Sequence, residues 1–154
     1  MTQAAICRIL YVRMAIALES RSVLHLENLE TLSRGALIDA VTEGLPSSLL
    51  RELAQRLGVT LEEMATLLRL TPRTLQRRLD DDRLDLGESE RLWELSRLFF
   101  RAIEVLESEQ GAVRWFHSPI RALGYSTPLK FARTSIGIRE LENILGRIEH
   151  GVFS

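Results

Sequence analysis

Two helix-start signals, one at Thr60 and one at Thr71, constrain the fold more than any other part of this sequence. Thr60-Leu61-Glu62-Glu63 is a capping box, in which the threonine hydroxyl and the last glutamate satisfy free amides at a helix start. Thr71-Pro72 starts a second helix, because threonine is a good N-cap and proline fits the first helical position. Two short helices joined by a tight turn are therefore predicted between Leu61 and Leu79. That is the pattern of a helix-turn-helix unit.

The apolar residues in and before this unit predict how it packs. Ala65 is a small residue midway along the first helix, so the second helix can cross it closely. A preceding helix is predicted from near Pro46 to Gly58, with leucines at helical spacing. We expect a small shared core made of Met64, Leu68, Leu70 and Leu75 with Leu53 and Leu57 of that preceding helix.

The outward face of the second helix is the candidate DNA-binding surface. Arginine and glutamine can read base edges with two hydrogen bonds, and threonine and arginine can hold phosphates. The alternative is a solvated helix face with no nucleic-acid role, and the acidic residues Asp80–Asp82 would repel a phosphate backbone. The candidate DNA-binding residues are Thr71, Arg73, Thr74, Gln76, Arg77 and Arg78.

The turn between the two helices departs from the usual pattern at Arg69. This position commonly holds a glycine with positive φ, and another residue there costs about 1 kcal/mol. We therefore expect an altered turn that the fold tolerates, with weaker DNA binding as its consequence.

The rest of the chain also favours helices. Apolar residues make up 45% of the 154 residues, enough for a buried core, and no stretch alternates as a strand would. Asp85 and Glu88 start a long helix that is predicted to reach about Leu106. We predict an all-α helical bundle in three parts: an N-terminal arm or irregular helix (1–32), a helix-turn-helix core with the long helix (33–110), and a small helical C-terminal module (111–154).

Composition also narrows the class of function. The formal net charge is −1, so nucleic-acid binding would need a local basic patch. The single cysteine, Cys7, fits a reducing cytoplasm, and no apolar run is long enough to span a membrane. His25, His117 and His150 have no metal-ligand spacing, and the glycines form no phosphate-binding loop. We therefore predict no catalytic residues, no metal and no cofactor, and a protein that is not an enzyme.

Several short motifs carry a resemblance to a known family. They are Arg73-Thr74-Leu75, Arg77-Arg78-Leu79, Trp115-Phe116, Ser118-Pro119, Arg121-Ala122-Leu123-Gly124, Thr127-Pro128-Leu129 and Gly146-Arg147-Ile148-Glu149-His150-Gly151. Through them, residues 35–154 resemble the Xre/MbcA/ParS antitoxins, which pair with RES-domain toxins. The resemblance implies an Xre-like helix-turn-helix that binds the operator of its own operon. It also implies a C-terminal module that binds and silences an NAD-consuming RES toxin, and a homodimer formed through the helical core.

The C-terminal module contains the candidate toxin-binding residues. Trp115 and Phe116 are adjacent, so on a helix they cannot both face one core; either one lies at an interface, or both are buried against the long helix. The tail Glu149–Ser154 follows the last helix, and we expect it to enter the basic NAD cleft of the toxin, the alternative being a frayed terminus. The candidate toxin-binding residues are Trp115, Phe116, Pro119, Glu149, His150, Gly151, Val152, Phe153 and Ser154.

Three functions remain open on these grounds. The first is an antitoxin that both neutralises a toxin and represses its own operon. The second is a plain helix-turn-helix transcriptional regulator without a toxin partner. The third is an interaction protein that has lost DNA binding, as Arg69 and the acidic residues after the second helix would suggest.

Overall fold

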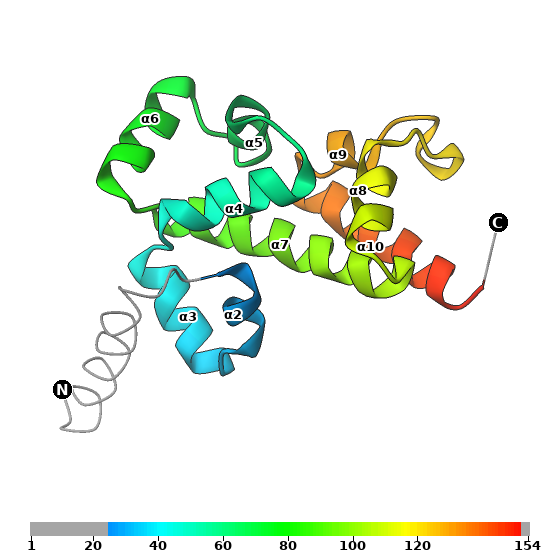
Figure 1. Cartoon of the computed structure of the whole chain (residues 1–154), viewed down its shortest axis with the longest axis horizontal. Helices are drawn as coiled ribbons and strands as arrows, with labels where there is room; N and C mark the ends of the chain where they lie inside the picture. Colours follow the sequence, from blue (N-terminus) through cyan, green and yellow to red (C-terminus); the bar gives the residue numbers. More distant parts are fainter. Residues whose placement is uncertain (1–24, 152–154) are drawn as a thin grey trace.

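A computed structural model describes residues 25–151 as a bundle of helices (Figure 1). Within these residues no strand forms, and the only β-type pairing is an isolated bridge between Ile120 and Ser126. The all-α prediction is confirmed. In chain order the elements are α2 (Leu26–Thr31), α3 (Arg34–Glu43), α4 (Ser47–Leu57), α5 (Leu61–Leu67), α6 (Pro72–Asp81), α7 (Leu86–Leu106), α8 (Glu109–His117), the 3₁₀ helix η2 (Arg121–Leu123), α9 (Pro128–Phe131) and α10 (Ser135–Glu149).

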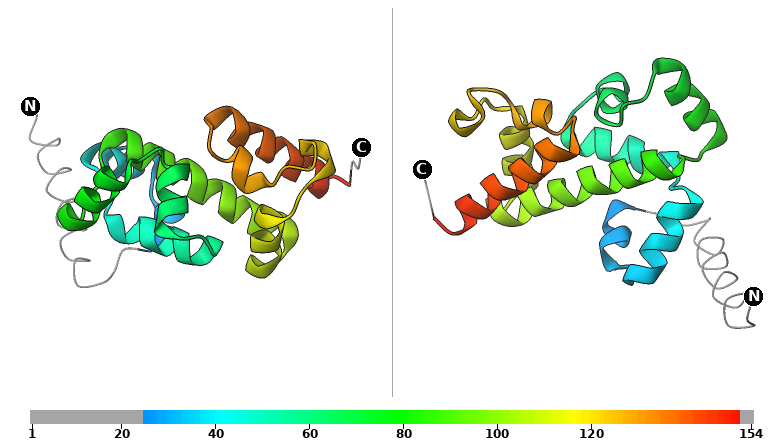
Figure 2. Two further views of the ribbon diagram at one scale, coloured as in Figure 1. Left: turned by 90° about the horizontal axis from the view of Figure 1, so that it is seen from above. Right: turned by 180° about the vertical axis from the view of Figure 1, so that it is seen from behind.

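The long helix α7 is the axis of the molecule. Asp85 caps it with the predicted capping box: the Glu88 amide donates to Asp85 Oδ1 at 2.9 Å, and the Asp85 amide donates to Glu88 Oε2 at 2.8 Å. Helices α3, α4, α8 and α10 all pack on α7. As Figures 1 and 2 show, the elements up to α6 gather around one half of α7, and α8–α10 gather around the other half.

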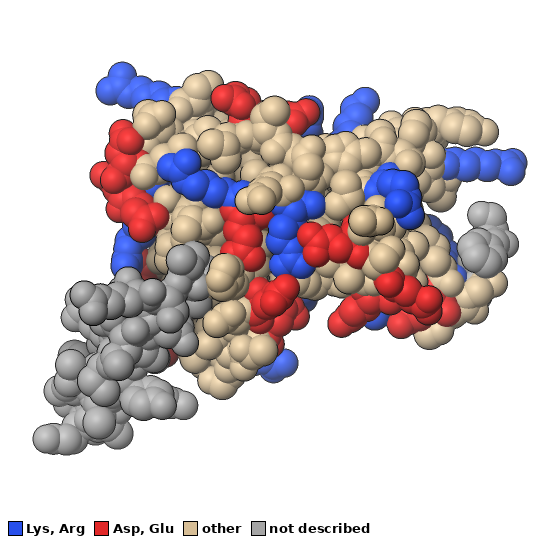
Figure 3. Space-filling view, in the orientation of Figure 1, with Lys and Arg blue, Asp and Glu red and all other residues tan. Residues whose placement is uncertain are grey.

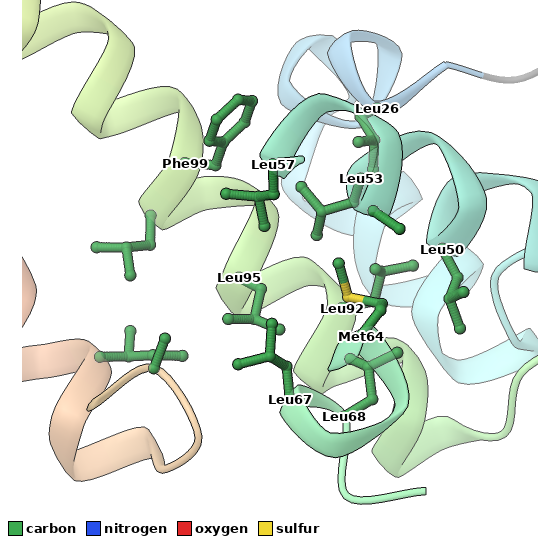
Figure 4. Close-up of a cluster of buried hydrophobic side chains, with 14 of the residues drawn as sticks. Leu26, Leu50, Leu53, Leu57, Met64, Leu67, Leu68, Leu92, Leu95 and Phe99 are labelled. Atoms are coloured by element: carbon green, nitrogen blue, oxygen red, sulfur yellow. The ribbon is translucent and has the colours of Figure 1, made fainter. Parts of the chain in front are cut away.

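The core predicted around the helix-turn-helix unit is present. Figure 4 shows α4, α5 and α7 contributing apolar side chains to one cluster. Met64 and Leu68 of the first helix and Leu75 of the second are buried, and Leu70 is half-buried at the edge of the cluster. The buried residues drawn there are Leu53, Leu57, Met64, Leu67, Leu68, Leu92, Leu95 and Phe99, among others.

The N-terminal part of the described chain is more firmly packed than the sequence indicated. Residues 26–31, inside the segment we expected to be an arm or irregular helix, form α2, in which Leu26 and Leu29 have no exposed surface. The Leu26 amide donates to the Glu52 carboxylate of α4, at 3.2 Å from Oε2. The last part of the predicted arm therefore belongs to the core. Cys7 and the rest of residues 1–24 lie outside the described residues.

The residues just before α4 and α10 act as their N-caps. Pro46 is the N-cap of α4, at the start predicted from the sequence. Thr134 caps α10: its hydroxyl accepts a hydrogen bond from the Gly137 amide at 2.9 Å. Gly137 has to be a glycine, because an added Cβ would lie 1.9 Å from the Phe131 carbonyl oxygen.

Candidate functional site

Helices α5 and α6 form the predicted helix-turn-helix unit. The Glu63 amide donates to Thr60 Oγ1 at 3.1 Å, and the Thr60 amide donates to Glu63 Oε2 at 2.8 Å, which completes the first capping box. The Thr74 amide donates to Thr71 Oγ1 at 3.1 Å, so Thr71 caps α6 with Pro72 at its first position. Both helix starts predicted from the sequence are confirmed.

The turn between α5 and α6 keeps its shape although Arg69 replaces the usual glycine. Arg69 has a φ of 60°, the left-handed conformation that glycine adopts at lower cost. The Leu70 amide donates to the Ala65 carbonyl at 2.8 Å, so the turn remains hydrogen-bonded. The expected alteration of the turn was therefore wrong. The exposed Arg69 side chain donates from Nε to the Arg133 carbonyl at 3.3 Å.

The outward face of α6 presents most of the predicted DNA-binding residues to solvent. Arg73, Gln76 and Arg77 are exposed, and Thr74 is half-buried. Arg73 and Arg77 are four residues apart and so lie on one face of the helix. Neither arginine forms an ion pair with any residue between 25 and 151, and both are free to contact phosphates or base edges. Gln76 Nε2 donates to Asp80 Oδ1 at 2.8 Å.

Arg78, the remaining arginine of the predicted DNA-binding set, is engaged by acidic side chains within the fold. Its side chain is only 17% exposed, and it forms ion pairs with Asp85 Oδ2 at 2.8 Å and with Glu88 Oε2 at 2.6 Å. The close contact with the Glu88 carboxylate is the main cause of the raised pKa of Arg78, and burial opposes the rise. A DNA contact by Arg78 stays a prediction, and it would require these ion pairs to break. The Arg78 guanidinium holds the C-terminal part of α6 against the start of α7.

The three acidic residues at the end of α6 have different roles. Asp82 is the C-cap of α6 with a φ of 49°, and its Oδ1 accepts a hydrogen bond from Ser47 Oγ at 2.7 Å. Asp80 accepts the hydrogen bond from Gln76, and Asp81 is exposed. Two of the three acids therefore have a local structural role.

The predicted toxin-binding residues are spread over the C-terminal module. Phe116 is 1% exposed, with its ring centroid 6.1 Å from that of Phe99, whereas Trp115 is half-buried with its ring edge-on to Phe116 at 5.1 Å. One aromatic therefore lies in the core, and the other reaches the surface. Pro119 is exposed after α8, Glu149 pairs with Arg101, and His150 and Gly151 are exposed at the end of α10. Val152, Phe153 and Ser154 lie outside the described residues.

One residue that the sequence analysis missed connects the two halves of the molecule. Arg91, on α7, is only 6% exposed. Its Nε donates to the Leu67 carbonyl at the end of α5 at 3.2 Å, and its Nη2 donates to the Ala132 carbonyl that follows α9. Its Nη1 pairs with Glu94 Oε2 at 3.0 Å. Burial is the main cause of the lowered pKa of Arg91, and the hydrogen bond with Glu94 opposes it.

The described residues were also compared with the requirements of a membrane-spanning helix and of a metal site. In residues 25–151, no helix is both long enough and apolar enough to cross a membrane. No three histidine, cysteine or acidic side chains come together within the described part of the chain in a way that could hold a metal ion.

Comparisons with known proteins divide the chain at α7. The model of the antitoxin Xre-like helix-turn-helix domain matches residues 36–97, and the model of the antitoxin Xre/MbcA/ParS C-terminal toxin-binding domain matches residues 101–151. The chain is 30% identical to an antitoxin Xre of Yersinia enterocolitica over 125 residues, which are 79% of this chain and 84% of that protein. It is 37% identical to an antitoxin Xre of Photorhabdus laumondii over 68 residues, 44% of this chain and 46% of that protein.

A solved structure is similar as well. A chain in the crystal structure of the M. tuberculosis MbcT–MbcA toxin–antitoxin complex matches 68% of this chain and 94% of its own length. The TM-score is 0.52 at 24% sequence identity, so this likeness concerns the fold.

Proposed function

This chain belongs to the Xre/MbcA/ParS antitoxin family, and we propose that it neutralises an NAD-consuming RES-domain toxin and represses its own operon. The chain is an antitoxin with a helix-turn-helix domain and a toxin-binding domain, and not an enzyme. The observation that carries the proposal is the match of the toxin-binding domain to residues 101–151, which fold as the packed unit of α8–α10 on the end of α7. We further propose that it acts in the cytoplasm as a homodimer.

The accessible face of α6 supports operator binding. Arg73 and Arg77 are exposed and have no ion-pair partner among residues 25–151, as a helix that enters the major groove requires. We propose that these two arginines, with Gln76 and the N-terminal threonines of α6, contact the operator.

Co-expression with the adjacent gene tests the antitoxin function. The product of that gene is expected to stop growth and lower cellular NAD when expressed alone, and to do neither when this chain is present. A harmless neighbour that forms no complex with this chain would contradict the proposal and favour a plain transcriptional regulator.

A salt titration of operator binding tests the second role. Arg73→Ala and Arg77→Ala are each expected to weaken binding by about 1–3 kcal/mol if they read bases, or to reduce the salt dependence if they contact phosphates. Arg139→Ala is the matched control, because Arg139 is an exposed arginine on α10 at the other half of the molecule. No binding of the wild-type chain at low salt would mean that the helix-turn-helix has lost its DNA function.

The tail gives a separate test of how the toxin would be silenced. We propose that Glu149–Ser154 covers the NAD cleft of the toxin, because Glu149, His150 and Gly151 are exposed at the end of α10. Deletion of Val152–Ser154 is then expected to restore NAD consumption in the purified complex. Unchanged inhibition after the deletion would refute this part of the proposal.

A further inference from the structure

The segment that links α8 to α10 has an unusual charge distribution. Between Gly111 and Arg139 the sequence contains no aspartate or glutamate, but it contains five arginine or lysine residues. Three of these, Arg121, Lys130 and Arg133, lie between the two helices; all three are exposed and none forms an ion pair with another described residue.

The acidic residues of the same module are already paired. Glu109 pairs with Arg56 at 2.8 Å, and Glu142 pairs with Arg97 at 2.5 Å. Glu140 and Glu149 also have arginine partners. Figure 3 shows the result on one face: blue and tan atoms cover the region of α8 and α9, and red atoms follow the edge formed by α7 and α10. The positive charges of the linking segment are therefore left without compensation.

Two large apolar side chains are exposed in this segment and at the start of the helix that follows it. Tyr125 is 72% exposed and Ile136 is 74% exposed, the two highest values among the exposed large hydrophobic residues of the described chain. The backbone of Tyr125 is hydrogen-bonded, because its amide donates to the Ile120 carbonyl at 3.0 Å. Its φ is 64°. Ile136 lies in the first turn of α10. We call these two residues, with Arg121, Lys130 and Arg133, the linker surface.

We propose that the toxin docks on the linker surface. The matching face of the toxin would have an apolar pocket with carboxylates around it. This inference rests on the proposed function and specifies the partner's chemistry. Exposed aromatic and aliphatic anchors are typical of protein interfaces, and unpaired cations select an acidic partner and accelerate its association. A nucleic acid would use the cations, but its phosphates offer nothing to Ile136, so the protein partner fits the whole surface better.

The structure allows variants that change this surface without unfolding it. Ile136→Glu removes an apolar anchor and adds a negative charge, yet an acidic residue in the first turn of a helix is favourable for the helix. Arg121→Glu with Lys130→Glu reverses two charges at exposed positions. Ile38→Glu is the matched control: Ile38 is 58% exposed on α3, on the other half of the molecule.

The measurement uses the full chain and the purified product of the adjacent gene as the probe. Ile136→Glu is expected to raise the Kd at least about 30-fold, as the loss of a central anchor does. The double charge reversal is expected to slow association about tenfold and to flatten its salt dependence, and Ile38→Glu to leave the Kd unchanged. Circular dichroism checks that each variant stays folded.

Each other outcome overturns the inference in an identifiable way. If the wild-type chain does not bind the probe, the proposed function fails and the inference fails with it. If the wild type binds and both linker-surface variants bind equally well, only the docking surface is wrong. If the variants instead alter the oligomeric mass or the affinity for DNA while toxin binding is kept, the surface serves a second copy of the chain or a nucleic acid.

Discussion

Replacement of Arg91 by methionine is expected to destabilise the antitoxin more than any exposed charge change. The side chain is 6% exposed and donates to two carbonyl oxygens, of Leu67 and Ala132, in addition to its pair with Glu94. A hydrogen bond from a charged donor contributes about 1.5–3 kcal/mol, and a buried acceptor left without a donor costs about as much. Methionine fills similar space and recovers part of this by burying an apolar chain. We expect a net loss of about 3 kcal/mol in the free energy of unfolding.

The assay is thermal and urea denaturation followed by circular dichroism. For a domain of this size, about 3 kcal/mol corresponds to a fall in Tm of roughly 6–12 °C. Arg91→Lys is expected to lose less, because an ammonium group keeps the charge but cannot reach all of the partners of the guanidinium group. Arg97→Met is the control: Arg97 is 53% exposed and makes an ion pair with Glu142, so its loss should cost no more than about 1 kcal/mol.

The reasoning would be refuted by equal losses in Arg91→Met and Arg97→Met. That result would mean that water or neighbouring amides satisfy the Leu67 and Ala132 carbonyls when the guanidinium group is absent. The connection between the helix-turn-helix unit and the C-terminal module would then depend on apolar packing alone.

Two other substitutions test local features of the same fold. Gly137→Ala should destabilise the chain by about 2 kcal/mol in urea denaturation, because the added Cβ would overlap the Phe131 carbonyl. Gly146→Ala is the control: the space around Gly146 in the same helix is open, so this change should stabilise the chain by up to about 1 kcal/mol. Equal effects of the two substitutions would contradict the predicted overlap. Glu30→Gln should raise the Tm slightly at neutral pH, because burial and then Glu104 raise the pKa of the Glu30 carboxyl, which makes its charged form unfavourable in the folded state. The wild type should gain stability as the pH falls through that raised pKa, so the advantage of Glu30→Gln should shrink in a series of melts towards pH 4.

The helix-turn-helix was predictable because its signals are local. The Thr60 and Thr71 caps depend on residues three positions away, and both hydrogen-bonding patterns form as expected. The turn at Arg69 was misjudged for a related reason: a positive φ in a non-glycine residue is a modest cost, which the packing of Met64, Leu68 and Leu75 can offset.

The roles of two arginines could not be read from the sequence because their partners are set by tertiary contacts. Arg78 lies on α6 beside Arg77, and only the approach of α7 directs it towards Asp85 and Glu88. The partners of Arg91 include main-chain carbonyl oxygens, which have no sequence signature. A partial signal existed, since Arg91 lies four residues before the core residue Leu95 and therefore on a buried face. The short helix α2 was missed because only Leu26 and Leu29 mark its inner side.

The division of the chain inside α7 has a consequence for how such antitoxins can diverge. The two family domains meet between residues 97 and 101, in the middle of a continuous helix rather than in a loop. A single inserted residue there would turn everything after it by about 100° and displace it by about 1.5 Å. Relatives should therefore vary in loop length but conserve the length of this helix. Natural or engineered exchange of toxin-binding modules between antitoxins should succeed only where the junction keeps the helical phase.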